Sequence, residues 1–280
     1  MPMLPRANLA AAADQASAAI SAEESAFLMH ARGWVLFPGC LPDSGVRALG
    51  RECEEAYEAC RKVQEKNGVA TASMQGAAHH VVGYGGALDR FIEELPLQEQ
   101  IERYFDDGKY IILTYGAAIN PPGATPYTCK PHRDVRAHTG DYHLSLNMLV
   151  MLDDFTAENG ATLILDGSHH LPEPPSTALF ERHARQITGK AGDIVLFNSL
   201  VVHSAAPNRT GSSPRRCLTL CFGHPYVKPQ IDFSRYLPQD VQDRFTPFAR
   251  QLLGFNARIA SSLEEYYQPT DRWMFKADQR

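Results

Sequence analysis

The sequence predicts a mainly β domain with flanking helices, and three observations support that fold class. From residue 110 to residue 222 the apolar runs are short and are separated by turn residues. Before that stretch, apolar residues recur at helical spacings instead. No repeat or low-complexity block divides the chain. We therefore expect a single domain at 26–280, with a β-core at about 110–222, a helical N-terminal part and a closing C-terminal segment.

Two stretches before the β-core have the spacing of helices that each bury one stripe. The first begins at Asp43 or Ser44, either of which can cap it, and ends at Gly68. The second is interrupted by Pro96, which must break or restart the helix. A helix followed by a first strand is expected at 26–41. The apolar positions of the two stretches are Val46, Leu49, Cys53, Ala56, Cys60 and Val63, then Leu88, Phe91, Ile92, Leu95, Leu97, Ile101, Tyr104 and Phe105.

The rest of the chain is expected to form a loop, a series of antiparallel strands and one closing helix. Residues 67–86 are rich in Gly, Ala and Ser without a period, which favours a loop near the functional site. Short apolar runs bounded by Pro-Pro-Gly, Glu-Asn-Gly and similar turns are typical of strands in a sandwich or barrel. Residues 240–254 have the pattern of a helix. The strands are expected at 110–119, 144–152, 161–165, 193–202 and 215–222.

Composition and charge favour a small molecule as the partner. The chain has 280 residues, of which 44% are hydrophobic and 21% charged, so it is long enough to bury a substantial core. Its formal charge is −5, and no basic stretch is present to displace the counterions of nucleic acid or to attract an anionic membrane. We therefore expect a small-molecule substrate, no nucleic acid and no membrane partner. A monomer or a homodimer would fit equally well.

The chain ends and the cysteines favour a cytoplasmic protein. Residues 1–25 are expected to form a flexible tail, because Asn8, Asp14 and Gln15 interrupt what would have to be the apolar core of a signal peptide. No run approaches eighteen apolar residues, so no membrane span is expected. The six cysteines show no C-x-x-C spacing, which indicates reduced and mostly buried thiols.

A candidate metal site begins with an H-x-D triplet, His132 and Asp134. On an extended strand both side chains would project from one face while Arg133 points away. His203, at the end of the apolar run 193–202, is placed to add a third ligand from another strand, although a lone histidine there is more often structural. Two imidazoles and one carboxylate favour Fe(II), Mn(II) or Co(II) and leave one face of the metal open, as non-haem Fe(II) oxygenases require.

Arg215 adds a candidate carboxylate clamp. It opens the run 215–222, which follows the strand expected to carry His203, so in an antiparallel pair it could reach the same cavity. A guanidinium holds a carboxylate through two parallel hydrogen bonds, as a dicarboxylate co-substrate would need. Arg216 would point to the opposite face, so only one of the two arginines can serve, and a surface arginine at a strand start is the plain alternative.

These residues carry a family resemblance. The chain resembles the phytanoyl-CoA dioxygenase-like branch of the Fe(II)/2-oxoglutarate oxygenases in four segments: HRD at 132–134, LDDFTAENGATLILDGSHH at 152–170, GDIVLFNSLVVHSAAPN at 192–208 and RRCLTLCF at 215–222. The resemblance implies a double-stranded β-helix, a jelly roll of the cupin-like type, with helices packed along one sheet. It also implies Fe(II), 2-oxoglutarate and O2 as the cofactor and co-substrates.

Carried over position by position, the resemblance implies a role for six residues. His132, Asp134 and His203 match the iron ligands, and Arg215 matches the arginine that binds the distal carboxylate of 2-oxoglutarate. Thr162 and Asn147 match supporting positions. The implied activity is hydroxylation of an unactivated C–H bond of a small metabolite, with release of succinate and CO2. Because Asp134 is present, halogenating relatives, which lack that carboxylate, are a poor match.

Residues near the substrate and the alternative functions complete the expectations. A cupin-like metal- or ligand-binding domain without oxygenase turnover is the main alternative, and a zinc-dependent hydrolase is a third. No CoA-specific or phosphate-cradling motif is present, so the resemblance indicates a reaction type and leaves the substrate open. Side chains expected near the substrate, from the loop before the β-core or next to the metal-binding segments, are His79, Tyr84, Tyr115, Asn120 and Arg136.

Overall fold

The computed structural model describes residues 20–123 and 126–279. Most of the expected N-terminal tail, residues 1–19, lies outside the described residues. Helix α2 (Ala22–Arg32) begins within the last residues of that expected tail. The Ser21 side chain caps this helix by accepting a hydrogen bond from the Glu24 amide.

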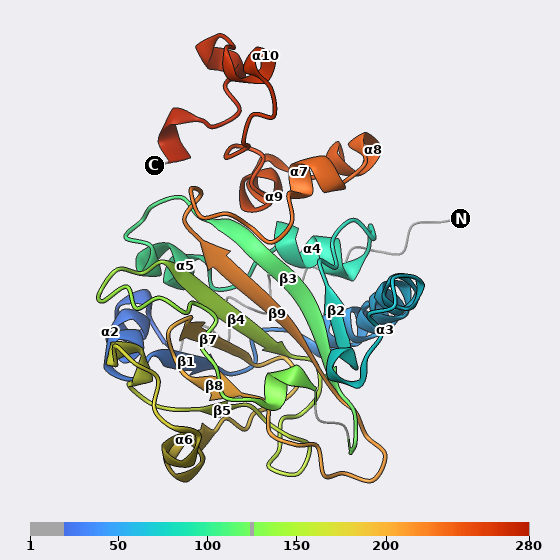
Figure 1. Cartoon of the computed structure of the whole chain (residues 1–280), viewed down its shortest axis with the longest axis vertical. Helices are drawn as coiled ribbons and strands as arrows, with labels where there is room; N and C mark the ends of the chain where they lie inside the picture. The colour runs from blue at the N-terminus through green and yellow to red at the C-terminus, as the bar shows by residue number, and fades with distance from the viewer. Residues whose placement is uncertain (1–19, 124–125, 280) are drawn as a thin grey trace.

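Two antiparallel sheets form the β-core, as expected for a double-stranded β-helix (Figure 1). The larger sheet has six strands in the order β1-β7-β4-β9-β3-β2, and the smaller has three in the order β6-β5-β8. The strands are β1 (Trp34–Phe37), β2 (Ala77–His79), β3 (Ile111–Asn120), β4 (Ser145–Met151), β5 (Leu163–Ile164), β6 (Arg185–Gln186), β7 (Ile194–Asn198), β8 (His203–Ser204) and β9 (Arg215–Gly223).

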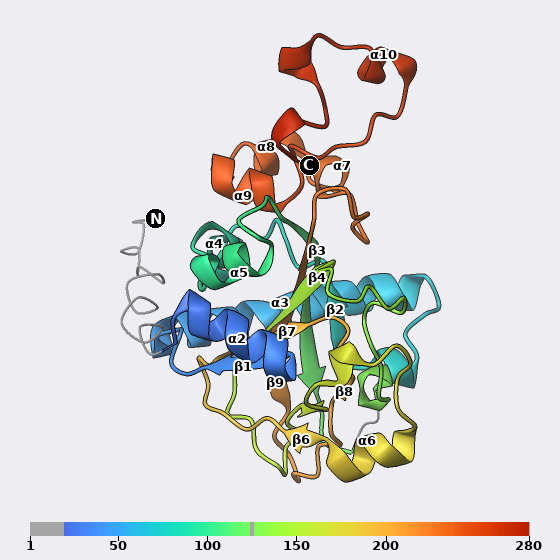
Figure 2. The same ribbon diagram turned by 90° about the vertical axis from the view of Figure 1, so that its left-hand side faces the viewer.

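Helices cover one face of the larger sheet and leave its other face to the smaller sheet (Figure 2). The residues of β9 alternate accordingly: Leu218, Leu220 and Phe222 pack in the helix-side core, whereas Arg215 and Cys217 face the smaller sheet. The helices that follow α2 are α3 (Asp43–Lys66), α4 (Ala87–Glu93), α5 (Gln98–Tyr104), α6 (Thr177–His183), α7 (Phe233–Tyr236), α8 (Gln239–Gln242), α9 (Pro247–Leu252) and α10 (Leu263–Tyr266).

Helix α3 buries most of the stripe that its sequence predicts. Val46, Leu49, Cys53 and Ala56 are buried in the helix-side core. Val63, near the C-terminal end, is 58% exposed, so the stripe stops one turn earlier than its spacing suggests. Within the described residues, no helix has the length and apolar character needed to cross a membrane.

Three expected elements are wrong in detail. The helix expected at 240–254 is divided into α8 and α9, because Thr246 caps a new helix whose first residue is Pro247. The loop expected at 67–86 contains strand β2, which pairs with β3. The strand expected at 193–202 ends at Asn198, whose carbonyl and side-chain oxygens accept the amides of Val201 and Leu200 in a turn.

Candidate active site

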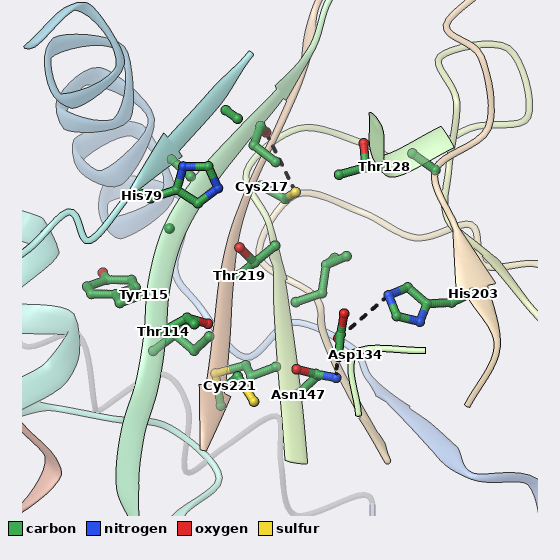
Figure 3. A pocket seen from close by; sticks show the side chains of 18 of the residues that line it. His79, Thr114, Tyr115, Thr128, Asp134, Asn147, His203, Cys217, Thr219 and Cys221 are labelled. Carbon is green, nitrogen blue, oxygen red and sulfur yellow. Dashed lines mark hydrogen bonds and ion pairs between the residues drawn. The ribbon is translucent and has the colours of Figure 1, made fainter. Parts of the chain in front are cut away.

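A pocket of about 400 Å³ lies between the facing sides of the two sheets. Side chains from β3, β4 and β9 form one wall, and the segment around Asp134 together with His203 of β8 forms the other (Figure 3). Because the turn at Asn198 separates β7 from β8, His203 belongs to the smaller sheet and faces the larger one. The pocket therefore collects residues from distant parts of the chain.

His132, Asp134 and His203 meet at one point of this pocket. The amides and carbonyls of His132 and His203 bond to each other in both directions at 3.0 Å, which sets their rings 4.4 Å apart. His132 Nε2 lies 3.4 Å from Asp134 Oδ1, and His203 Nε2 lies 3.8 Å from Asp134 Oδ2. Among the described residues, this is the one group of three potential metal ligands whose donor atoms all fall within 4.8 Å.

Hydrogen bonds with neighbouring residues orient these three side chains as metal ligands. His132 Nδ1 bonds to the Lys130 carbonyl at 2.8 Å, and His203 Nδ1 bonds to the Val201 carbonyl at 3.0 Å. A carbonyl only accepts, so each Nδ1 carries a proton and each Nε2 is the ring nitrogen that faces Asp134. Asn147 Nδ2 donates to Asp134 Oδ2 at 2.8 Å and fixes the carboxylate from the larger sheet.

The pKa shifts favour the ligating form of Asp134 and His203 but favour the protonated form of His132. Burial opposes the charge on Asp134, but the neighbouring imidazoles and Asn147 outweigh it, so the pKa of the carboxyl lies below its ordinary value. Burial lowers the pKa of His203 and outweighs the attraction of Asp134. For His132 burial is likewise the largest influence, yet the hydrogen bond to Asp134 and the other raising interactions together exceed it, so its pKa is raised. The pocket thus presents a carboxylate and a neutral His203 at neutral pH.

Arg215 is a buried cation for which the described residues supply no anionic partner. It is 3% exposed, and its Nε and Nη1 atoms have no hydrogen-bond partner. Its guanidinium lies over the Phe155 ring, 4.3 Å from the centroid, and burial lowers its pKa. The nearby carboxylate of Asp153 is occupied by Arg216, which bonds to it at 2.6 Å and 3.0 Å and also reaches Glu54. An unpaired buried guanidinium is costly, and a carboxylate would satisfy it.

The route by which Arg215 reaches the pocket differs from the expected one. Strand β9 lies between β3 and β4 and does not pair with β8. Arg215 therefore approaches from the larger sheet, whereas His203 approaches from the smaller. Arg216 points to the opposite side of β9, as the alternation along a strand predicts. Arg133 also points away from the pocket, toward the carbonyls of Ser168 and Leu171.

The remaining predicted residues divide into those in the pocket and those outside it. Thr162 lines the pocket and is buried, and Asn120 lies directly opposite Arg215 in the β3–β9 register with its Oδ1 unpartnered. His79 lies at the rim, where its Nε2 is 3.3 Å from the Tyr127 hydroxyl. Asn147 lines the pocket too, but its contact is with Asp134.

Three residues expected near the substrate do not direct their side chains into the pocket in the same way. Tyr115 belongs to the pocket-lining part of β3, but its ring points to the helix side, where its hydroxyl donates to the Leu88 carbonyl (Figure 3). Tyr84 and Arg136 are exposed and are not among the described residues that line the pocket, although the charge of Arg136 lies close enough to His132 to act to lower the pKa of that imidazole. Their position in the sequence, close to pocket-lining segments, does not determine which way they point.

The pocket-lining residues that the sequence did not single out include Tyr127 and Lys228. Tyr127 lies in a short 3-10 turn (Tyr127–Cys129) close enough to Asp134 for that carboxylate to help raise the pKa of its phenol, after burial. Lys228 lies in the segment after β9. Neither segment has a periodic pattern, so only the fold brings these two residues to the pocket.

The sequence of the chain is similar to those of known proteins. The profile of the phytanoyl-CoA dioxygenase family matches residues 29–217. An uncharacterised protein of Mycobacterium tuberculosis is 29% identical over 218 residues, which cover 76% of this chain and 80% of the relative. An iron/α-ketoglutarate-dependent dioxygenase of Penicillium thymicola is 34% identical over 117 residues, 42% of this chain and 36% of the relative.

A solved structure shares the fold. EctD from S. alaskensis, determined with 2-oxoglutarate and 5-hydroxyectoine, superposes with a TM-score of 0.57 at 19% identity over 73% of this chain and 76% of the other. At that identity the likeness concerns the architecture alone. The family profile covers most of the chain and includes His132, Asp134, His203 and Arg215. The chain thus belongs to the phytanoyl-CoA dioxygenase family of Fe(II)/2-oxoglutarate-dependent oxygenases.

Proposed function

We propose that this protein is a dioxygenase that uses Fe(II) and 2-oxoglutarate to hydroxylate an unactivated C–H bond of a small metabolite, releasing succinate and CO2. One observation carries the proposal: three convergent metal-ligand side chains and a buried guanidinium with unsatisfied N–H groups line the same pocket. The first feature fits a metal with an open face, and the second fits the far end of a dicarboxylate.

The proposed roles follow from the contacts of each residue. His132 Nε2, His203 Nε2 and a carboxylate oxygen of Asp134 would hold the iron. Arg215 would bind the distal carboxylate of 2-oxoglutarate, and the Thr162 hydroxyl, which lines the same pocket, would support it. Asn147 would act through Asp134 by fixing its orientation. This donor set contains no thiolate, which favours iron over structural zinc.

The iron supplies the oxidation when bound, through the decarboxylation of 2-oxoglutarate by O2. The residues of this chain bind the iron and 2-oxoglutarate, orient them and exclude water. The two sheets bury His203, which is only 9% exposed, whereas the side chains of His132 and Asp134 are 33% and 38% exposed and face the pocket. The neutral Nε2 of His203 and the ionised Asp134 carboxylate need no proton release before they coordinate. Positioning of this kind is the protein's main contribution in cofactor-dependent reactions.

The proposal also covers the substrate class, the location and the assembly of the protein. A small-molecule substrate fits the size of the pocket, about 400 Å³. All six cysteines are free, which is compatible with the reducing cytoplasm that we propose as the location. A monomer or a homodimer remains the proposed assembly, without nucleic-acid or membrane partners.

Turnover with isotope-labelled dioxygen tests the proposed function. We expect succinate to be formed from 2-oxoglutarate only with Fe(II) and O2, and one labelled oxygen atom to enter succinate and the other the hydroxylated product. Asp134→Ala should abolish succinate formation, whereas His183→Ala, at the end of α6 outside the pocket, should leave it unchanged. Equal conversion of the substrate with Zn(II) in place of Fe(II), or conversion of the substrate without O2, would contradict the proposal and favour a hydrolase.

A further inference from the structure

One positive charge in the pocket lining is left in excess once Fe(II) and 2-oxoglutarate occupy the proposed site. Among the described pocket-lining residues, Asp134 is the one carboxylate, and Arg215 and Lys228 are the two side chains with a permanent positive charge. Iron(II) carries two positive charges. Asp134, a doubly charged 2-oxoglutarate and Arg215 together contribute two negative charges, so the filled centre is neutral. The charge on Lys228 is left without compensation.

Lys228 lies at the opposite end of the pocket from Arg215. In the β3–β9 register, Arg215 is opposite Asn120, whereas Cys221 is opposite Thr114. These two levels are six residues apart along β9, a distance of roughly 20 Å for an extended strand. The segment that carries Lys228 is attached beyond the second level, because the Gln230 amide donates to the Leu113 carbonyl at 3.1 Å.

The metal ligands lie near the second level, just before the segment that carries Lys228. Asn147, which bonds to Asp134, is opposite Cys221 in the β4–β9 register. The order along the pocket is therefore Arg215, the three metal ligands and Lys228. A co-substrate held by Arg215 and the metal occupies the first part, so the substrate must occupy the part between the metal and Lys228.

No protein carboxylate in the structure neutralises Lys228. It is exposed and takes part in none of the ion pairs formed among the described residues. Its neighbour Gln230 also lines the pocket and offers an amide beside it. An exposed lysine with three donors in the lining of a pocket favours an anionic group.

Building on the proposed function, we propose that the substrate carries an anionic group, a carboxylate or a phosphate monoester, and that Lys228 binds it while the C–H bond to be oxidised lies at the metal. Lys228 is thus a specificity-determining residue. It selects substrates by charge and sets how far the oxidised carbon lies from the anionic end.

Amide NMR of the full-length protein tests this inference without turnover. The isotope-labelled protein is loaded with Zn(II), which is redox-inert, and with saturating 2-oxoglutarate, which occupies Arg215. Butyrate, n-butyl phosphate and the neutral butyramide are then titrated separately. We expect saturable shifts of the amides of Val227, Lys228 and Gln230 with one or both anions and none with butyramide, and the preferred anion distinguishes a carboxylate from a phosphate site.

Variants assign the effect to the ammonium group. Lys228→Met should weaken binding of the anion by about fivefold or more, the size of one solvent-accessible ion pair. Lys228→Arg should retain it, and Lys109→Met, which removes the same charge outside the pocket, should leave it unchanged.

Two results would overturn the inference: no saturable shift at these amides with either anion, or equal anion binding in wild type and Lys228→Met. Shifts caused by 2-oxoglutarate itself are recorded in the same samples. Their absence would count against the proposed function, whereas their presence without anion binding would count against Lys228 alone.

Discussion

At the scale of single residues, the contrast between two adjacent arginines is the most instructive feature of the site. Arg216 is satisfied by Asp153 and Glu54, while Arg215, buried on the other side of the strand, has unpartnered N–H groups. The protein therefore retains a charge that is unfavourable in the empty pocket. That cost is offset only when an anion binds, which is why Arg215 indicates function and Arg216 indicates structure.

Replacing each arginine in turn tests this distinction. Arg215→Met should raise the 2-oxoglutarate concentration required for half-saturation by about a hundredfold, because a charge-assisted pair of about 3 kcal/mol is lost. The ligand-free variant should be no less stable than wild type. Arg216→Met should lower the free energy of unfolding but leave 2-oxoglutarate binding nearly unchanged. Calorimetric titration and urea unfolding measure the two quantities, and the reverse pattern would assign the clamp to Arg216.

Asn147 is expected to tune the metal without contacting it. Its amide donates to Asp134 Oδ2 at 2.8 Å and to the Ser199 hydroxyl at 3.1 Å. Asn147→Ala should lower the affinity for Fe(II) by about ten- to hundredfold, as is typical when a group that orients a ligand is removed. Asn67→Ala, at the end of α3, is the control. An unchanged affinity in anaerobic competition with a chelator would show that the carboxylate needs no support from β4.

At the scale of secondary structure, helix α3 supplies the N-terminal cap of helix α4 on the larger sheet. Helix α4 has no side-chain cap of its own at Gly86, and Glu52 of α3 accepts the amides of Ala87 at 2.5 Å and Leu88 at 2.9 Å instead. A carboxylate at a helix N-terminus also interacts favourably with the helix dipole. This contact joins α3 to α4 over the face of the sheet.

Loss of that shared cap should be measurable. Glu52→Ala should destabilise the protein by about 1–2 kcal/mol, since two amides at the start of α4 lose their acceptor. Glu55→Ala, an exposed position on the same helix, should change the stability little. Urea unfolding monitored by circular dichroism gives both values. A Glu52→Ala protein as stable as wild type would mean that solvent replaces the carboxylate.

The elements also show what a single sequence can and cannot predict. Strands β3, β4 and β9 follow from short apolar runs between turns, and the stripe of α3 follows from its period. The division of the 193–202 run was missed because the turn depends on Asn198, a residue that also suits a strand end. The division of 240–254 could have been found, since Thr246-Pro247 is a strong helix-start signal.

The candidate site shows the same limit. The spacing of His132 and Asp134 and the family resemblance suggested the metal-ligand set, and the structure brings these residues together with His203. The sequence did not predict that the Tyr115 ring points to the helix side or that Tyr84 lies outside the pocket lining, since β3 has a bulge between Ile112 and Thr114 and Tyr84 lies in an aperiodic loop. Tyr127 and Lys228 approach the pocket from irregular segments, which no periodicity describes.

At the scale of the whole molecule, the two sheets meet around a polar pocket and not only around a continuous apolar core. Apolar residues such as Phe155, Ile164 and Val195 join the sheets on one side of that pocket. His203 of β8 and Asp134 lie on the smaller-sheet side of the pocket, and Asn147 of β4 holds Asp134 from the larger sheet, so a bound metal would become part of this connection. Ligand binding should therefore stabilise the whole fold.

Thermal unfolding tests this coupling. Fe(II) and 2-oxoglutarate at about one hundred times their dissociation constants should each add about 2.7 kcal/mol to the stability, visible as a higher Tm. A chelator should reverse the metal effect. In His203→Ala the shift caused by the metal should be lost. Equal shifts in wild type and His203→Ala would place metal binding elsewhere on the molecule.

The most direct test of the central claim is an anaerobic titration of Fe(II) and 2-oxoglutarate, followed by the weak visible absorption band of the iron complex of a 2-oxo acid. The account predicts a band in the wild type that disappears in His132→Ala and that requires far more 2-oxoglutarate in Arg215→Ala. Absence of the band in wild-type protein that demonstrably holds iron would contradict the assignment of 2-oxoglutarate and favour a binding domain without oxygenase turnover.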